Sequence, residues 1–106
     1  MTIEEFIDNK APQLAVYGKA FLSDELDFCE IQLYLWDTLE EWQQLIPTSE
    51  AQTEMETVFW HLLHSFSKWP DWMIRGNHYL CQQLHACCDF LCLGGQMPSG
   101  CIGIRP

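Results

Sequence analysis

The sequence predicts an all-α fold, an antiparallel bundle of four or five helices followed by a short extended C-terminal tail. Three observations lead to this prediction. Every strong apolar periodicity in the 106 residues has helical spacing, helix-capping signals recur between the apolar stretches, and no linker, repeat or low-complexity tract divides the chain. One domain is the usual content of a chain of this length, so residues 1–106 are predicted to form a single helical domain.

The first helix is predicted from a capping box at the N-terminus. Thr2 and Glu5 have the S/T-x-x-E spacing, in which each side chain accepts a hydrogen bond from the other residue's backbone N–H, so a helix should begin directly after the threonine. Pro12 lacks the N–H that a helix interior requires. We therefore expect a break in the few residues before Pro12 and a second helical piece that ends near Leu22.

A long second helix is predicted between Ser23, a suitable N-cap, and Pro47, which should end it. One face of this helix has apolar residues at steps of three and four: Phe28, Ile31, Leu35, Leu39, Trp42 and Ile46. A second apolar stripe lies beside the first and consists of Leu26, Cys29, Leu33 and Trp36. Two stripes predict that the helix faces two neighbours, because each apolar face needs a cover.

The third helix is predicted to follow a second capping box, formed by Ser49 and Gln52. Its core face repeats at steps of four and three through Met55, Phe59, Leu62, Phe66 and Trp69. The Trp-Pro-Asp-Trp sequence at residues 69–72 should end this helix, because proline cannot continue it.

A last helix is predicted from Asn77, which is a favourable N-cap, to about Leu93. The glycine pair at residues 94–95 can adopt the left-handed conformation that commonly follows a helix C-terminus. The remaining tail contains prolines and glycines and should be extended. We expect Ile102 and Ile104 to pin this tail onto the bundle, because both are apolar.

Five of the six cysteines lie in the nearly uncharged stretch 76–104. Thiolates and imidazoles are ligands for zinc and copper(I), and one hypothesis is a metal site on the last helix. Its ligands would be Cys81, His85, Cys88 and Cys92, completed by Cys101 or by His61 and His64. The other interpretation is a helix buried at the centre of the bundle, or in a homodimer seam, with no cofactor. A leucine stripe beside the cysteines and aromatic residues on the third side favour this second interpretation.

The sequence gives little indication of catalysis. His85 and Cys88 are one helical turn apart and could in principle form a Cys–His pair. A nucleophile also needs an oxyanion stabiliser, and the glycine pair of this chain follows a helix C-terminus, which is the wrong end for binding an anion. His-Glu-x-x-His and Glu-x-x-His metal motifs are missing as well. We therefore do not expect an enzyme.

The chain has a formal net charge of −10, and its first half carries most of that charge. Residues 1–56 contain thirteen Asp/Glu and two Lys/Arg, whereas residues 57–106 contain two and three. This charge argues against nucleic acid and against anionic membranes as partners. The chain has no apolar run of membrane-spanning length, no basic and apolar signal-peptide start and no CxxC motif. These features predict a cytoplasmic protein with free thiols.

The acidic helix faces are the candidate functional surface. Five carboxylates of the second helix lie away from its core stripe, namely Asp27, Glu30, Asp37, Glu40 and Glu41. Glu50, Glu54 and Glu56 of the next helix should extend the acidic surface. Trp69 and Trp72 could anchor a partner or close the end of the core. The hypothesis is a small acidic cytoplasmic module, an adaptor or inhibitor, that binds a basic protein partner. The alternatives are a zinc- or copper-binding bundle and a structural domain that forms a homodimer.

Overall fold

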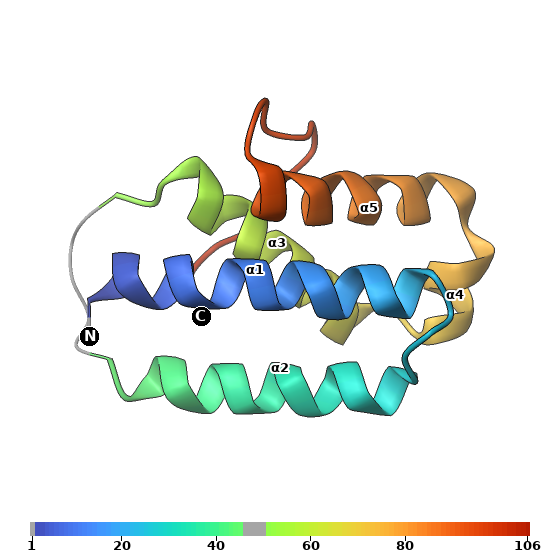
Figure 1. The fold of residues 1–106 in the computed structure, drawn as a ribbon, viewed down its shortest axis with the longest axis horizontal. Helices are drawn as coiled ribbons and strands as arrows, with labels where there is room; N and C mark the ends of the chain where they lie inside the picture. The colour runs from blue at the N-terminus through green and yellow to red at the C-terminus, as the bar shows by residue number, and fades with distance from the viewer. Residues whose placement is uncertain (1, 46–50) are drawn as a thin grey trace.

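The computed structural model describes residues 2–45 and 51–106, and the predicted all-α class is confirmed. The described residues form four long helices and one short one, shown in Figure 1: α1 (Ile3–Leu22), α2 (Phe28–Gln43), α3 (Glu54–Lys68), α4 (Asp71–Gly76) and α5 (His78–Leu93). None of these helices combines the length and the apolar character that crossing a membrane requires.

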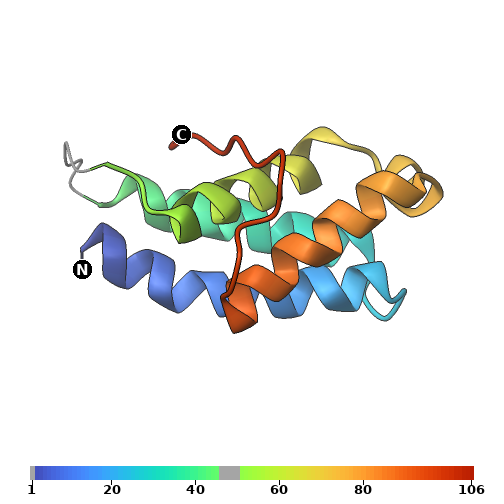
Figure 2. The same ribbon diagram turned by 90° about the horizontal axis from the view of Figure 1, so that it is seen from above.

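Helices α1 and α3 form the middle of the bundle, since each packs against all three of the other long helices. Helices α2 and α5 lie on opposite sides of this pair and run antiparallel to α1 (Figure 1). Figure 2 shows that α5 crosses the bundle at an angle and that the C-terminal tail then passes across α3. The residues of α5 and the tail are thereby brought onto α3.

Aromatic rings fill the centre of the core. Trp60 of α3 is fully buried, and its ring centroid lies 4.8 Å from those of both Trp42 and Phe59. Phe6 of α1 lies 5.6 Å from Trp42 and is also buried. Buried aromatic side chains remove large apolar areas from water, so this cluster joins α1, α2 and α3 into one core.

Helices α1, α3 and α5 begin at side-chain caps, and the cap of α3 differs from the one predicted. The hydroxyl of Thr2 accepts a hydrogen bond from the backbone N–H of Glu5, and the Asn77 side chain accepts one from Leu80 N–H, as predicted. Helix α3 is capped by Thr53, whose hydroxyl accepts from Glu56 N–H at 3.1 Å. Ser49, the expected cap of this helix, lies outside the described residues.

The predicted break before Pro12 is wrong, because α1 is continuous from Ile3 to Leu22. An internal proline costs a helix about 3 kcal/mol through its missing hydrogen bond and its steric clash. The apolar side chains on both sides of Pro12 are buried in the core, among them Ala11, Leu14 and Ala15. Their burial offsets the cost of the proline and holds the two halves of the helix in line.

The prediction that Ser23 caps the second helix is wrong. Ser23 instead lies at the C-terminal end of the first helix. Its N–H donates to Lys19 O at 2.9 Å, so the backbone still follows the last turn of α1. Asp24 then adopts a left-handed conformation with φ 63°, which reverses the direction of the chain. Helix α2 consequently begins at Phe28, with Asp27 as its N-cap.

The expectation that the last helix forms the centre of the bundle is also wrong. Helix α5 buries one face, with Leu84, Cys87, Cys88 and Leu91, while Tyr79 and Leu93 on its other side are more than 80% exposed. The buried face packs closely on α1: a Cβ atom added to Gly18 would lie 2.7 Å from the Cys88 sulfur. The low charge of α5 therefore reflects one tightly packed face rather than burial all round.

The tail is held by residues other than those expected. Ile102 and Ile104 are 78% and 71% exposed, because the extended backbone turns them outwards. Gly103 between them is buried against the α3 backbone, where a Cβ atom would collide with Thr57 O and His61 N. The carbonyl of Gly103 accepts a hydrogen bond from the Gln52 side chain at 2.9 Å. The close approach of two backbones, which only glycine permits, fixes the tail on α3.

Candidate partner-binding surface

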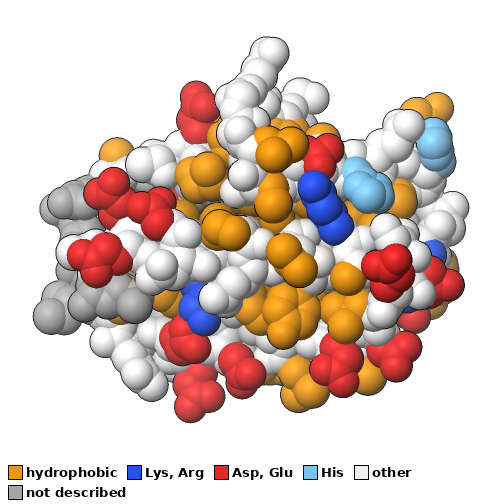
Figure 3. Space-filling model, viewed as in Figure 1, with side chains coloured by type: hydrophobic (Ala, Val, Ile, Leu, Met, Phe, Trp, Pro, Cys, Tyr) orange, Lys and Arg blue, Asp and Glu red, His pale blue; other side chains and the backbone are white. Residues whose placement is uncertain are grey.

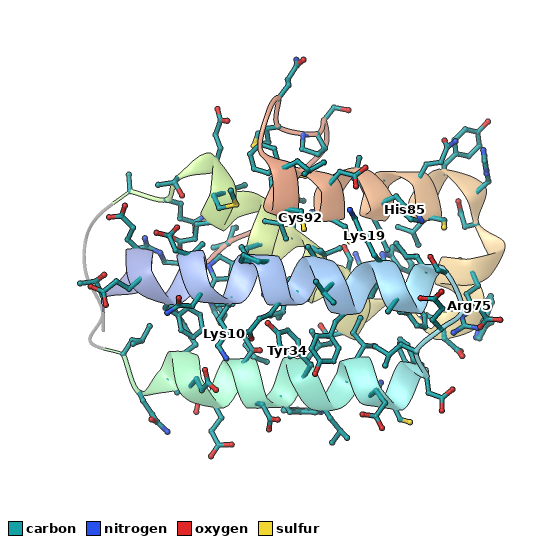
Figure 4. The ribbon with its side chains drawn as sticks, viewed as in Figure 1. Lys10, Lys19, Tyr34, Arg75, His85 and Cys92 are labelled. Atoms are coloured by element: carbon teal, nitrogen blue, oxygen red, sulfur yellow. The ribbon has the colours of Figure 1, made fainter. Side chains whose placement is uncertain are left out.

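Helix α2 is attached to the core by one face only. Its buried residues are Ile31, Tyr34, Leu35 and Thr38, which lie towards α1 and α3. The Tyr34 hydroxyl donates a hydrogen bond to Lys10 O at 3.2 Å, and the Tyr34 ring stacks on that of Tyr17 with centroids 4.5 Å apart. Figure 4 shows Tyr34 and Lys10 between α1 and α2. Burial raises the pKa of Tyr34 to about 12, so its hydroxyl remains a hydrogen-bond donor at neutral pH.

The opposite face of α2, which we call the α2 outer face, is a line of residues at steps of four, three and four: Cys29, Leu33, Trp36 and Glu40. All four are exposed, and Leu33 and Trp36 are the large apolar members, 58% and 71% exposed. The second stripe predicted a second neighbour for α2. Leu26 of that stripe packs against the core, whereas no element in the described parts of the chain covers Leu33 or Trp36. A contiguous patch of large apolar side chains on a protein surface often marks a binding site.

Carboxylates surround these apolar side chains. Asp27, Glu30, Asp37, Glu40 and Glu41 are all exposed. Glu41 forms an ion pair with Lys10 at 2.6 Å, and within the described residues the other four make no ion pair. In Figure 3, acidic side chains lie along the lower side of the molecule, over α2, with apolar side chains between them. The α2 outer face is thus a small apolar centre with an acidic border.

Glu56 does not belong to this acidic surface, although we expected it to. It is 3% exposed, accepts a hydrogen bond from Trp60 Nε1 at 3.1 Å and forms an ion pair with the guanidinium of Arg105. Sequence spacing does not indicate this pair, because the arginine lies 49 residues away in the tail. Glu54, by contrast, is exposed, and Glu50 lies outside the described residues.

The two tryptophans of the α3–α4 corner are placed differently. Trp69 is partly buried against the core, with Lys68 Nζ 4.8 Å from the centroid of its ring. Trp72 is 69% exposed. Trp69 therefore closes the end of the core, whereas Trp72 remains available to a partner.

The three cysteines and one histidine proposed as an alternative metal site lie along one side of α5 and differ in burial. Cys88 is buried, Cys81 and His85 are partly buried, and Cys92 is exposed. Figure 4 shows His85 and Cys92 on the side of α5 where Lys19 of α1 also lies. Within the described residues, the one group of three or more candidate ligands that lie close together is a different set, His61, Cys87 and Cys101.

The two fully buried thiols predict a loss of stability at alkaline pH. Burial raises the pKa of Cys88 from its ordinary 9.0 to about 12, and burial also raises the pKa of Cys87 strongly. A raised folded-state pKa means that the folded protein keeps a proton that the unfolded chain releases, so this stability is present below pH 9 and is lost above it. At pH 10 the two thiols together should lower the free energy of unfolding by about 3 kcal/mol, roughly half of it from each.

Urea unfolding at pH 8 and pH 10, with reductant and chelator present, measures this effect. In Cys88→Ala the free energy of unfolding should decrease only about half as much between the two pH values, because one of the two buried thiols is missing. An unchanged free energy of unfolding between the two pH values would contradict the prediction.

The α2 outer face combines exposed apolar side chains with uncompensated carboxylates on a helix whose other side is fixed in the core. Such a surface can bind a protein by excluding water from its apolar centre and by pairing its charges with those of the partner. Comparison with protein-family models, with curated proteins and with solved structures finds no match to this chain, so its fold and candidate surface are argued from its own residues.

Proposed function

We propose that this protein is a non-enzymatic binding module, of the adaptor or inhibitor type, that docks a basic protein partner through the α2 outer face. The observation that carries the proposal is the exposure of Leu33 and Trp36, 58% and 71%, inside a border of carboxylates. An amphipathic bundle helix normally exposes polar residues. Here the exposed face has the composition of an interface centre, in which tryptophan is enriched.

The charge around this face indicates the chemistry of the partner. Residues 23–43 contain seven Asp/Glu and no Lys or Arg. Two of the seven have partners in the fold, Asp24 with Arg75 and Glu41 with Lys10. A partner with Lys or Arg around an apolar groove would offset the remaining charge and would associate faster at low ionic strength.

The fold presents this face in a fixed orientation. The buried side of α2 is held by Tyr34, whose hydroxyl donates to Lys10 O of α1 and whose ring stacks on that of Tyr17. A preformed face does not need to be ordered when it binds, and this saving favours affinity.

A second copy of this chain is a less favourable occupant of the same face. Two α2 outer faces brought together would place carboxylates opposite carboxylates, and like charges across an interface cost free energy. The homodimer alternative concerns a different surface, the nearly uncharged last helix α5. The cytoplasm is the proposed location, because all six cysteines are free and a reducing compartment keeps them so.

The test uses a synthetic amphipathic helical peptide, with leucine at positions i, i+3, i+4 and i+7 and lysine elsewhere, as the probe of the α2 outer face. Titrated into ¹⁵N-labelled protein, it should shift the amide signals of residues around Leu33 and Trp36. A matched peptide with glutamate in place of lysine should not bind. Trp36→Ala should weaken binding at least about tenfold, the usual effect of removing an interface anchor.

Trp72→Ala is the matched control, since Trp72 is 69% exposed but lies on α4. Asp37→Lys with Glu40→Lys should also weaken binding, and 0.5 M salt should weaken binding of the wild-type protein. An equal loss in Trp72→Ala and Trp36→Ala, or peptide-induced shifts spread over every acidic helix, would argue against the α2 outer face. Sedimentation of the free protein well above 12.4 kDa, lost in Trp36→Ala, would instead assign this face to a second copy.

A further inference from the structure

We propose that His61, Cys87 and Cys101 form a zinc-binding site between α3, α5 and the C-terminal tail. One ligand atom from each residue lies within 4.8 Å of the others, and the two sulfur atoms are 3.6 Å apart. The three residues come from three separate segments of the chain, and the fold brings them together. This site is independent of the α2 outer face, which lies on the other side of the bundle.

The sulfur–sulfur distance suits tetrahedral zinc. With Zn–S bonds of about 2.3 Å, two thiolates of a tetrahedral site lie about 3.8 Å apart. The separation of 3.6 Å therefore needs only a small adjustment. An imidazole nitrogen would bond at about 2.0–2.1 Å, so the metal would draw His61 slightly towards the two sulfurs. A non-protein ligand would complete the coordination.

The imidazole of His61 has no strong partner in the fold. Its Nε2 atom is buried, and it is the one buried side-chain nitrogen or oxygen in the described part of the chain that makes no hydrogen bond. The other nitrogen, Nδ1, accepts a long bond of 3.4 Å from Ile102 N–H. Buried polar atoms normally have a hydrogen-bond partner. A bound metal would give this imidazole a strong partner, and at most one long hydrogen bond would be lost.

The charge balance favours zinc over copper(I). Cys87 is fully buried and Cys101 is half-buried, and burial raises the pKa of both thiols. Zn²⁺ with two thiolates is electrically neutral, whereas Cu⁺ with two thiolates carries one negative charge. A neutral complex costs less to bury in a site of low dielectric constant.

Zinc binding would release two protons, one from each thiol: Zn²⁺ displaces H⁺ from Cys87 and from Cys101, and both leave to the buffer. The apparent affinity should therefore increase about 100-fold per pH unit while the thiols of the free protein remain protonated. Besides the three ligands, the titratable groups next to the site are His64 on α3 and Cys88 on α5. His64 has a pKa lowered by burial and by His61, so neither its charge nor a proton from it should alter the count above pH 7.

The contacts that hold the C-terminal tail on α3 also hold Cys101 in place before a metal binds. Gly103 lies directly on the α3 backbone, Gln52 bonds to Gly103 O, and the N–H of Arg105 donates to Gln52 Oε1 at 2.9 Å. Sites held by supporting contacts bind metal with less ordering of the chain.

The experiment is a titration of reduced, chelator-treated protein with Co²⁺ and then with Zn²⁺. A 1:1 complex with thiolate-to-cobalt charge-transfer absorption, displaced by zinc, is expected. Cys101→Ser and His61→Gln should each weaken zinc binding more than about 100-fold, because even outer-shell changes cost 10- to 100-fold. Cys92→Ser is the matched control, an exposed cysteine of α5 outside the group, and should bind as the wild type does.

Calorimetry in two buffers of different ionisation enthalpy counts the protons, and two per zinc are expected. Circular dichroism of the metal-free variants confirms that each is folded. The proposal is overturned if no 1:1 complex forms, if Cys101→Ser binds zinc as tightly as the wild type, or if Cys92→Ser loses as much affinity as Cys101→Ser.

Discussion

Arg105→Met is expected to lower the free energy of unfolding by about 3–5 kcal/mol, a large effect for the penultimate residue of a chain. The reason is Glu56, which is 3% exposed and whose two carboxylate oxygens face the guanidinium, Oε1 accepting from Nη2 at 2.8 Å. Without Arg105 the carboxylate stays buried with a hydrogen bond from Trp60 Nε1 and loses its compensating charge. Chemical denaturation monitored by circular dichroism measures the loss.

Two comparisons distinguish this buried pair from an ordinary ion pair. Arg75→Met breaks the ion pair between Arg75 and Asp24, whose side chains are 37% and 79% exposed, respectively. This change should lower the free energy of unfolding by less than about 1 kcal/mol. The double variant Glu56→Met with Arg105→Met removes both charges and should recover most of the stability, because no uncompensated charge remains. Equal losses for Arg75→Met and Arg105→Met would mean that Glu56 is not held as a buried charge.

Local signals in the sequence determined most of the secondary structure. Thr2, Asn77 and the proline at the α3–α4 corner act within one or two turns, so their effects could be predicted from spacing alone. The predictions that failed involve competition between a local rule and the core. Pro12 should end a helix, but the buried residues on both sides of it keep α1 continuous.

The candidate sites were predicted only in part, because they depend on contacts distant in sequence. The carboxylates of α2 could be assigned to the surface from their spacing. The exposure of Leu33 and Trp36 could not, since an apolar stripe looks the same whether a neighbouring helix covers it or not. His61, Cys87 and Cys101 lie on three segments, and the path of the tail brings them together. His61 and Cys101 could be identified as possible ligands from the sequence, but nothing in the sequence groups them with Cys87.

The path of the tail depends on Gly103, and Gly103→Ala is expected to release it. A Cβ atom here would collide with backbone atoms of α3, Thr57 O and His61 N, which cannot move aside as a flexible side chain could. The tail must then lift, and Arg105 leaves Glu56. We expect a loss of at least the 3–5 kcal/mol given for Arg105→Met, about the cost of an unpaired buried charge. Thermal or urea unfolding gives the value, and faster amide exchange in residues 101–105 reports the released tail.

Gly76→Ala is the matched control, because a Cβ atom at Gly76, the last residue of α4, meets nothing within 4 Å. That change should be neutral or slightly stabilising, since alanine is the better helix former. The decisive comparison is the double variant Gly103→Ala with Arg105→Met. If Gly103 acts by holding the tail on α3, most of the stability lost in Gly103→Ala is already lost in Arg105→Met. The losses of the two single variants should then be far from additive. Additive losses would mean that Gly103 and Arg105 stabilise the protein separately, and the tail would then be a set of independent contacts rather than a single clamp across α3.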